Sequence, residues 1–285
     1  MIAQNFEYSA PENLHEALAL LAGGNAKVLA GGMSLIPLMK LRLAAPEHVV
    51  DLAHVPDLKS IREEGSSIRI GSMATHFEIE SSALIRGRCP LLAEAASNIG
   101  DVQVRNMGTI GGSIAHADPA ADYPASLMAL EAQVRLVSSK GERTLSIDQF
   151  FTDALSTALE AGEIVRELIV PVEEKGAGVS YRKMVQPASG FAIVGAAARV
   201  RRSGGKVSFV RVGITGLAGK AYRAANVEKL LEGTAGSSAD IQKAAAVVAD
   251  GVDANSDLHA SADYRRHMAQ VYTARALSQA VSRAS

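Results

Sequence analysis

The 285-residue sequence predicts an α+β protein built in two parts. Up to about residue 170, short strand-like runs alternate with helical patterns. From residue 179 onward, longer runs with alternating apolar side chains flank the turn Ser203-Gly204-Gly205, which is typical of a β-hairpin. Residues 171–178 contain two glycines, a proline and three charges, as linkers often do. We therefore expect one domain over residues 1–175 and a second over residues 176–285.

The first part opens with a helical pattern over residues 11–23. Proline suits a first helical turn, the leucines at 14, 18 and 21 share a face, and Gly23-Gly24 ends the pattern. Residues 35–43 follow the strand predicted at residues 27–30. The remaining patterns are strands at residues 27–30, 48–52, 67–70 and 134–137, and helices at residues 75–84, 90–99 and 125–131.

The second part reads as a sheet followed by helices. Strand patterns cover residues 179–185, 191–201 and 207–214. Two or three helices close the chain, and in the last one Met268, Val271, Tyr272 and Ala276 follow helical spacing. An antiparallel sheet with helices packed on it is the expected arrangement.

Composition narrows the class of protein. Hydrophobic residues make up 48% of the chain and the formal net charge is −1, which fits a packed protein without a basic surface for nucleic acid. No apolar run reaches membrane-spanning length, and the N-terminus lacks the pattern of a secretory signal, so we expect a cytoplasmic protein. Cys89 is the single cysteine, which excludes an internal disulfide and a cysteine-ligated iron–sulfur cluster within the chain.

Two glycine-rich turns carry the strongest chemical signal. Adjacent glycines permit positive φ and close approach of a ligand, and successive N–H groups then form a concavity that binds an anion. A single Gly-Gly pair is ordinarily just a tight turn. Two of the same design favour a pair of loops that close on one diphosphate. They are Ala30-Gly31-Gly32-Met33-Ser34 and Thr109-Ile110-Gly111-Gly112-Ser113.

Other signals are weaker. Residues 213–219 imitate a dinucleotide-binding turn but lack its glycine spacing, so a structural turn is favoured. His116, Asp118 and Asp122 show no metal-ligand spacing, and we expect no metal site. Cys89 lies beside an apolar helix and reads as a core thiol.

The residues around both turns resemble a known family. The pattern AGGxSLxPxxKxRL at residues 30–43, with TIGGSxAxAxPxxDxP at residues 109–124, is similar to the FAD-binding medium subunit of the molybdenum hydroxylases, of the carbon monoxide dehydrogenase type. The resemblance implies a two-lobed FAD-binding domain of the vanillyl-alcohol-oxidase type, with lobes of about residues 1–55 and 56–175. A smaller α/β domain with an antiparallel sheet and C-terminal helices would follow.

The resemblance also implies site residues. FAD would lie extended between the lobes, with its pyrophosphate held by the two turns. Asp122 would accept hydrogen bonds from ribityl or ribose hydroxyls, because a carboxylate repels phosphate. Lys183 and Phe191 match positions near the flavin ring, where a cation favours the reduced anion and an aromatic ring covers one face. Gly190 and Phe191 depart from some relatives, so a strand lysine and a core phenylalanine are the alternative reading.

The activity implied is electron transfer. Hydroxylation would occur at a molybdenum cofactor on a large partner, with iron–sulfur clusters on a small partner passing electrons through FAD to an external acceptor, in a heterohexamer. No residue of this chain is expected to be catalytic. The rivals are a self-contained FAD-dependent reductase or oxidase of the same fold, with Tyr181, Tyr222 and Ser189 as candidate proton donors, and a non-enzymatic nucleotide-binding scaffold.

Overall fold

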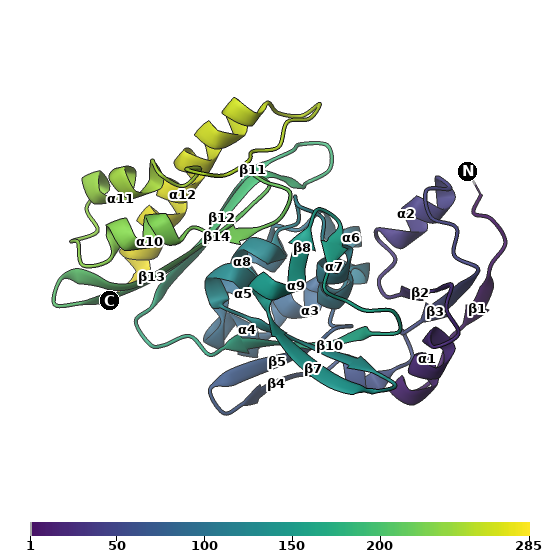
Figure 1. Ribbon diagram of the computed structural model, residues 1–285. Helices are drawn as coiled ribbons and strands as arrows, with labels where there is room; N and C mark the ends of the chain where they lie inside the picture. Colours follow the sequence, from purple (N-terminus) through teal and green to yellow (C-terminus); the bar gives the residue numbers. More distant parts are fainter. Residues whose placement is uncertain (1) are drawn as a thin grey trace.

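The computed structural model describes residues 2–285 and confirms the predicted α+β fold (Figure 1). The N-terminal lobe is a small parallel sheet in the order β1-β3-β2. Hydrophobic side chains of α1 pack on this sheet, and α2 follows β2. The elements are β1 (Glu7–Ser9), α1 (Leu14–Leu21), β2 (Ala26–Leu29), α2 (Leu35–Lys40) and β3 (His48–Asp51).

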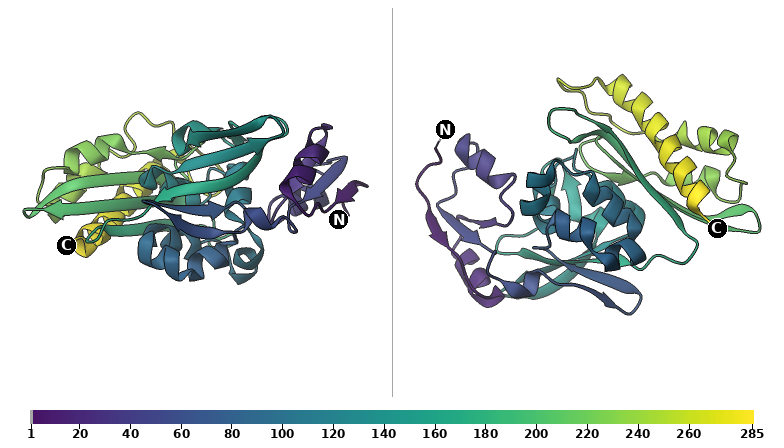
Figure 2. Two further views of the ribbon diagram at one scale, coloured as in Figure 1. Left: turned by 90° about the horizontal axis from the view of Figure 1, so that it is seen from below. Right: turned by 180° about the vertical axis from the view of Figure 1, so that it is seen from behind.

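The second lobe is an antiparallel sheet in the order β4-β5-β10-β6-β7, with a layer of helices on one side (Figure 2, left). The strands are β4 (Ile61–Glu64), β5 (Ser67–Gly71), β6 (Gln133–Ser138), β7 (Gly141–Ser146) and β10 (Ile164–Pro171). The helices are α3 (His76–Ser81), α4 (Ala83–Arg88), α5 (Pro90–Ser97), α6 (Val102–Met107), α7 (Ile110–His116), α8 (Tyr123–Leu130) and α9 (Ile147–Phe150). Short elements η1 (Pro56–Leu58), β8 (Phe151–Asp153) and β9 (Ser156–Thr157) complete it.

The C-terminal domain is an antiparallel sheet in the order β11-β12-β13-β14, followed by helices. Helix α12 packs on β11 and β12, and α8 of the second lobe packs on β12 and β13. Successive residues of β12 belong to different cores, since Ala197 joins the core of the second lobe and Ala198 the C-terminal core. The elements are β11 (Gly178–Val185), β12 (Ala192–Ser203), β13 (Lys206–Thr215), β14 (Tyr222–Arg223), α10 (Ala225–Leu231), α11 (Ser238–Ala245) and α12 (Ala262–Arg283).

The predicted elements lacked the strands β1, β4, β7 and β10. Local capping explains two further departures, both at helix boundaries. The first helix begins later than residue 11, because Asn13 is its N-cap and accepts the N–H of Glu16. The pattern over residues 75–84 is two helices, and the second is capped by Ser82. No helix within residues 2–285 is long and apolar enough to span a membrane.

Helix α8 contacts the C-terminal sheet backbone to backbone. A Cβ added to Gly213 on β13 would collide with the carbonyl oxygen of Ala125 on α8. All residues of α8 are buried, and the helix contacts both β12 and β13 of the C-terminal sheet. The glycine at 213 therefore sets how closely the two domains approach.

We expect Gly213→Ala to lower the free energy of unfolding by about 2 kcal/mol or more, because the methyl group forces α8 off the sheet. The measurement is urea unfolding of the full chain. Gly87→Ala is the matched control, since Gly87 lies in α4 with open space around its Cα. There alanine should stabilise the helix by up to about 1 kcal/mol. Equal effects at both positions would contradict the close-packing explanation.

Candidate functional site

The first glycine segment, residues 30–34, forms a concave turn between β2 and α2. Gly32 has φ +73°, which L residues avoid, and a Cβ there would lie 2.6 Å from Cδ1 of Ile36. Within the described chain, no group accepts a hydrogen bond from the backbone N–H of Gly31, Gly32, Met33 or Ser34. Successive unpartnered N–H groups around a left-handed glycine are the geometry that binds a diphosphate. The segment therefore fits that part of FAD.

The second glycine segment, residues 109–113, is built differently. Thr109 caps α7, so Gly111 and Gly112 are helical and the expectation of a positive-φ turn is wrong at this segment. The N–H of Ile110 donates to the carbonyl of Ala74 at 3.0 Å, and that of Gly111 to the carbonyl of Ser72 at 2.9 Å. The N–H of Gly112 donates to Oγ1 of Thr109 at 3.1 Å, and that of Ser113 to the carbonyl of Thr109 at 3.0 Å. This segment already has protein partners for its N–H groups.

The two segments meet where the lobes join (Figure 1). A Cβ on Gly31 would collide with the carbonyl oxygen of Met107 and would lie 2.7 Å from Cα of Gly108. Gly111 is packed equally closely on Ser72, with no room for a side chain. These glycines bring the first segment and α7 together, as the pair of predicted loops requires.

Asp122 lies in a buried cluster with Tyr181 and Lys183 of β11. The hydroxyl of Tyr181 donates to Oδ1 of Asp122 at 2.5 Å, and Nζ of Lys183 donates to Oδ2 at 3.0 Å. Nζ of Lys183 also donates to the carbonyl oxygens of Asn98 and Gly190, both at 2.6 Å. All three ammonium protons therefore have protein acceptors. The cluster ties β11 to the end of α5, the start of α8 and the loop that precedes β12.

Burial dominates the electrostatics of this cluster. It raises the pKa of Asp122 to about 6, and the positive charge of Lys183 and the Tyr181 hydroxyl offset part of that rise. A carboxylate accepts about four hydrogen bonds, so the two protein donors leave lone pairs for a cofactor hydroxyl. The predicted role of Asp122 toward ribityl or ribose hydroxyls stays a prediction.

Phe191 lies on the loop that Lys183 holds. Its side chain is 43% exposed, so the reading as a core phenylalanine is wrong. Its N–H donates to Oγ of Ser189 at 3.3 Å, and its carbonyl oxygen accepts the N–H of Gln186 at 2.8 Å. An exposed aromatic ring on a loop held in place is available to cover a flat ligand. Lys183 lies within strand β11, as the alternative of a strand lysine predicted.

The remaining candidates are structural. Cys89 is fully buried and burial raises the pKa of its thiol to about 12, which fits a core thiol. Across residues 2–285, no three His, Cys, Asp or Glu side chains gather to hold a metal. Residues 213–215 end β13, and the chain bends after them. The carbonyl of Pro119 accepts the N–H of Gly216 at 2.8 Å, so this glycine-rich run has a structural role.

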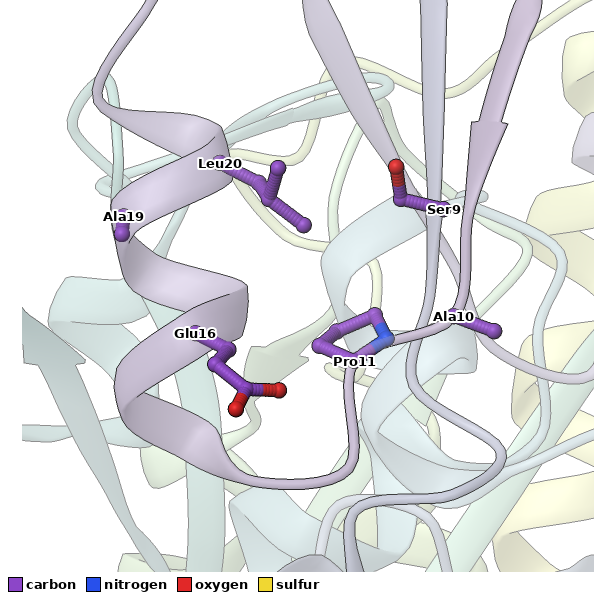
Figure 3. Close-up of a pocket in the computed structure, with 6 residues that line it drawn as sticks. All are labelled: Ser9, Ala10, Pro11, Glu16, Ala19 and Leu20. Atoms are coloured by element: carbon purple, nitrogen blue, oxygen red, sulfur yellow. The ribbon is translucent and has the colours of Figure 1, made fainter.

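A shallow pocket of about 520 Å³ on the N-terminal lobe is not part of this site (Figure 3). Its single ionisable group is Glu16, whose carboxylate accepts the N–H of Glu12 at 3.1 Å. It offers no cation or row of N–H groups for a diphosphate. Its lining is Ser9, Ala10, Pro11, Glu16, Ala19 and Leu20.

Sequence reasoning missed the segment that supports α7. Ser72, Ala74 and His76 pair with residues 108–111 through backbone hydrogen bonds, and Thr75 pairs with Thr109 as an isolated bridge. No side-chain pattern marks such a contact, because the backbone makes it. The capping sequence of Thr75 and Glu78 was the one available signal that the chain turns there.

Comparison with known proteins covers both domains. Residues 4–173 match the family described as FAD binding domain in molybdopterin dehydrogenase, and residues 155–280 match the CO dehydrogenase flavoprotein C-terminal domain. The chain is 43% identical to the carbon monoxide dehydrogenase medium chain of Hydrogenophaga pseudoflava over 99% of both chains. It is 34% identical to the glyceraldehyde dehydrogenase medium chain of Sulfolobus acidocaldarius, over 98% of this chain and 99% of that one. A solved structure of the Hydrogenophaga enzyme, lacking the Mo-pyranopterin moiety, superposes with a TM-score of 0.97, 44% identity and full coverage of both chains.

We expect Tyr181→Phe to destabilise the chain more at pH 8 than at pH 5. The lost hydrogen bond stabilises the carboxylate of Asp122, so its removal raises the folded-state pKa further above the usual 3.8. Because the pKa of Asp122 is higher in the folded than in the unfolded chain, protonated Asp122 contributes stability below pH 4, and this contribution is lost as pH rises through about 6. In Tyr181→Phe the folded-state pKa is higher still, so the variant loses more free energy of unfolding over this pH range. Urea unfolding should show a deficit of about 1–3 kcal/mol at pH 8.

Tyr222→Phe is the matched control for that experiment. Its hydroxyl donates to the carbonyl of Val248, which carries no charge, at 2.7 Å. The cost of losing this bond should therefore be the same at both pH values. If the loss of unfolding free energy in Tyr181→Phe were also the same at both pH values, the coupling to Asp122 would be refuted.

Proposed function

The chain belongs to the family of FAD-binding medium subunits of the molybdenum hydroxylases, and we propose that its first glycine segment is the main diphosphate site for FAD. Four unpartnered N–H groups at residues 31–34 support this assignment. Because these donors are uncharged, they match a diphosphate without requiring a basic side chain. This row of donors is the single observation on which the proposal rests.

The second segment completes the site in this proposal. Thr109, Ile110, Gly111 and Gly112 place the start of α7 beside the first segment, with Gly112 next to Ala30. The Ser113 hydroxyl, half-buried in α7, is a further donor toward the diphosphate. Ala30 and Met33 then line the turn with their backbones rather than with their side chains.

The far end of the site lies at the buried cluster and its loop. We assign Asp122 to a ribityl or ribose hydroxyl and Phe191 to one face of the flavin ring. Lys183 keeps a positive charge beside that region while its protons go to protein oxygens. A fixed cation next to the ring favours the reduced, anionic form of a flavin.

The chain is the flavoprotein subunit of an oxidoreductase complex, with the molybdenum cofactor on a large partner. When bound, FAD would supply two-electron chemistry between the iron–sulfur clusters of a small partner and an external acceptor. The residues of this chain bind and orient the cofactor. Cys89, buried with a raised pKa, is not available as a cluster ligand. Assembly as a heterohexamer, the external acceptor and cytoplasmic location stay predictions.

The substrate is selected on the large partner. Medium chains similar to this one occur in enzymes named for carbon monoxide and for glyceraldehyde. We propose that this chain transfers electrons for a complex that oxidises carbon monoxide, an aldehyde or an N-heterocycle.

A self-contained reductase would need its own proton donor facing the cofactor. The hydroxyl of Tyr181 donates to Asp122, that of Tyr222 to the carbonyl of Val248, and that of Ser189 to Oε1 of Gln186. Each candidate proton is already used within the protein. Together with the family membership, these bonds favour the electron-transfer subunit over this rival and over a scaffold without a cofactor.

We expect the chain to bind one FAD non-covalently. Gly32→Ala should weaken binding about tenfold or more, because the methyl group strains the turn and collides with the side chain of Ile36. The measurements are the flavin-to-protein ratio after gel filtration and the flavin released on denaturation. Gly24→Ala is the control, since Gly24 has φ +76° with open space around its Cα. It carries the same backbone strain outside the site. Equal loss of FAD from both variants would refute the assignment of the diphosphate site to the first glycine segment.

We expect the chain to co-purify with a large and a small subunit. The lone chain loaded with FAD should pass electrons from a chemical reductant to a dye, because that step needs only the flavin. Carbon monoxide, N-heterocycles and aldehydes should be oxidised by the assembled complex alone. Substrate-dependent dye reduction by the isolated, metal-free chain would instead establish a self-contained flavoenzyme.

A further inference from the structure

His76 lies under the second glycine segment. It is the first residue of α3 and is 4% exposed. Its N–H donates to the carbonyl of Gly108 at 2.9 Å, next to the bonds that join residues 72 and 74 to residues 110 and 111. His76 therefore belongs to the backbone ladder that carries the start of α7.

The imidazole ring itself contacts Gly108. A Cβ on Gly108 would lie 2.6 Å from Nε2 of His76, so the ring fills the space that a side chain would need. Gly108 also meets the first segment, since a Cβ on Gly31 would lie 2.7 Å from its Cα. Gly108 is thus in contact with the imidazole and with the diphosphate turn, and the position of the ring decides how closely that turn can approach α7.

The ring is held by its surroundings. It packs edge to face on Tyr123, with centroids 5.3 Å apart and planes at 63°, and Tyr123 is fully buried. Burial and the positive charge of Arg105 lower the pKa of His76 to about 4, so the ring is neutral at pH 7. Arg105 is itself paired with Glu80 at 2.9 Å. A neutral ring adds no charge to the site, and its contribution there is shape.

We propose that His76 is a positioning residue for FAD: its imidazole holds the Met107–Gly108 peptide against Gly31 and so sets the spacing between the first glycine segment and α7. This inference rests on the proposed FAD site. His76 acts through Gly108 and does not touch the cofactor. Misplacing a binding element by a fraction of an ångström weakens a preorganised site without unfolding the protein.

The test is equilibrium binding of FAD and of ADP to the apo form of the full chain. We expect His76→Ala to raise the Kd of FAD about tenfold to a hundredfold, and that of ADP by the same factor, because the spacing governs the shared diphosphate. Ile79→Val, a truncation of a fully buried side chain in the same helix, should leave both Kd values within about twofold. Near-ultraviolet circular dichroism checks that each variant is folded.

Gly108→Ala approaches the same contact from the other side. In the wild-type background its methyl group meets the imidazole and should weaken FAD binding. In the His76→Ala background the methyl group enters the vacated space, so its effect should shrink or reverse. This non-additivity is what direct contact predicts. It is calculated from the Kd values of the wild type, both single variants and the double variant.

The outcomes separate this inference from the function on which it rests. A wild-type chain that binds no FAD would refute the proposed function. If the wild type binds FAD and folded His76→Ala binds it equally well, the positioning role is refuted. A loss with FAD but not with ADP, or additive effects of the two substitutions, would also refute it, because His76 would then not act through the diphosphate segments.

Discussion

The buried pair of Lys183 and Asp122 is the interaction on which the arrangement of the molecule depends. A charge in the interior is tolerated only when its partners satisfy it, and here the ammonium and the carboxylate each have protein partners for their charge. Their side chains are about 5% and 4% exposed. Since these partners come from four separate segments, the charges fix the relative positions of β11, α5, α8 and the loop of Phe191.

A second constraint is the contact of backbone with backbone. Gly31 on Met107, Gly111 on Ser72 and Gly213 on Ala125 all lack room for a Cβ. Two of these contacts hold the proposed diphosphate site and the third holds the C-terminal sheet on α8. Side chains at these positions would hold the segments farther apart than they lie in the structure. The glycines thus matter chiefly for proximity, and only Gly32 among those of the two segments needs its left-handed conformation.

The sequence predicted the α+β class, the three long strands of the C-terminal sheet and the positions of both glycine segments, because hydrophobic periodicity and paired glycines are local signals. It missed β10, the middle strand of the second-lobe sheet. It also placed Asp122, Lys183 and Phe191 in one region through the family resemblance. It did not predict that Thr109 would cap a helix, because one hydroxyl in a glycine-rich stretch fits a turn as well as a cap. Ser72 escaped notice because its contribution comes from backbone pairing, and pairing between distant segments leaves no periodic trace. The imidazole of His76 escaped notice because it contacts Gly108, which is distant in the sequence.

The burial of α8 has a consequence for how this protein could evolve. The two family domains are recognised separately, yet their matches overlap over residues 155–173 and both pack on this helix. Every residue of α8 is buried, and the helix contacts α5 and β10 of the second lobe as well as β12 and β13 of the C-terminal sheet. If one domain were replaced by that of a relative, the residues of α8 that pack on it would therefore have to be replaced as well. Inheritance of the two domains as a unit follows from a single shared helix.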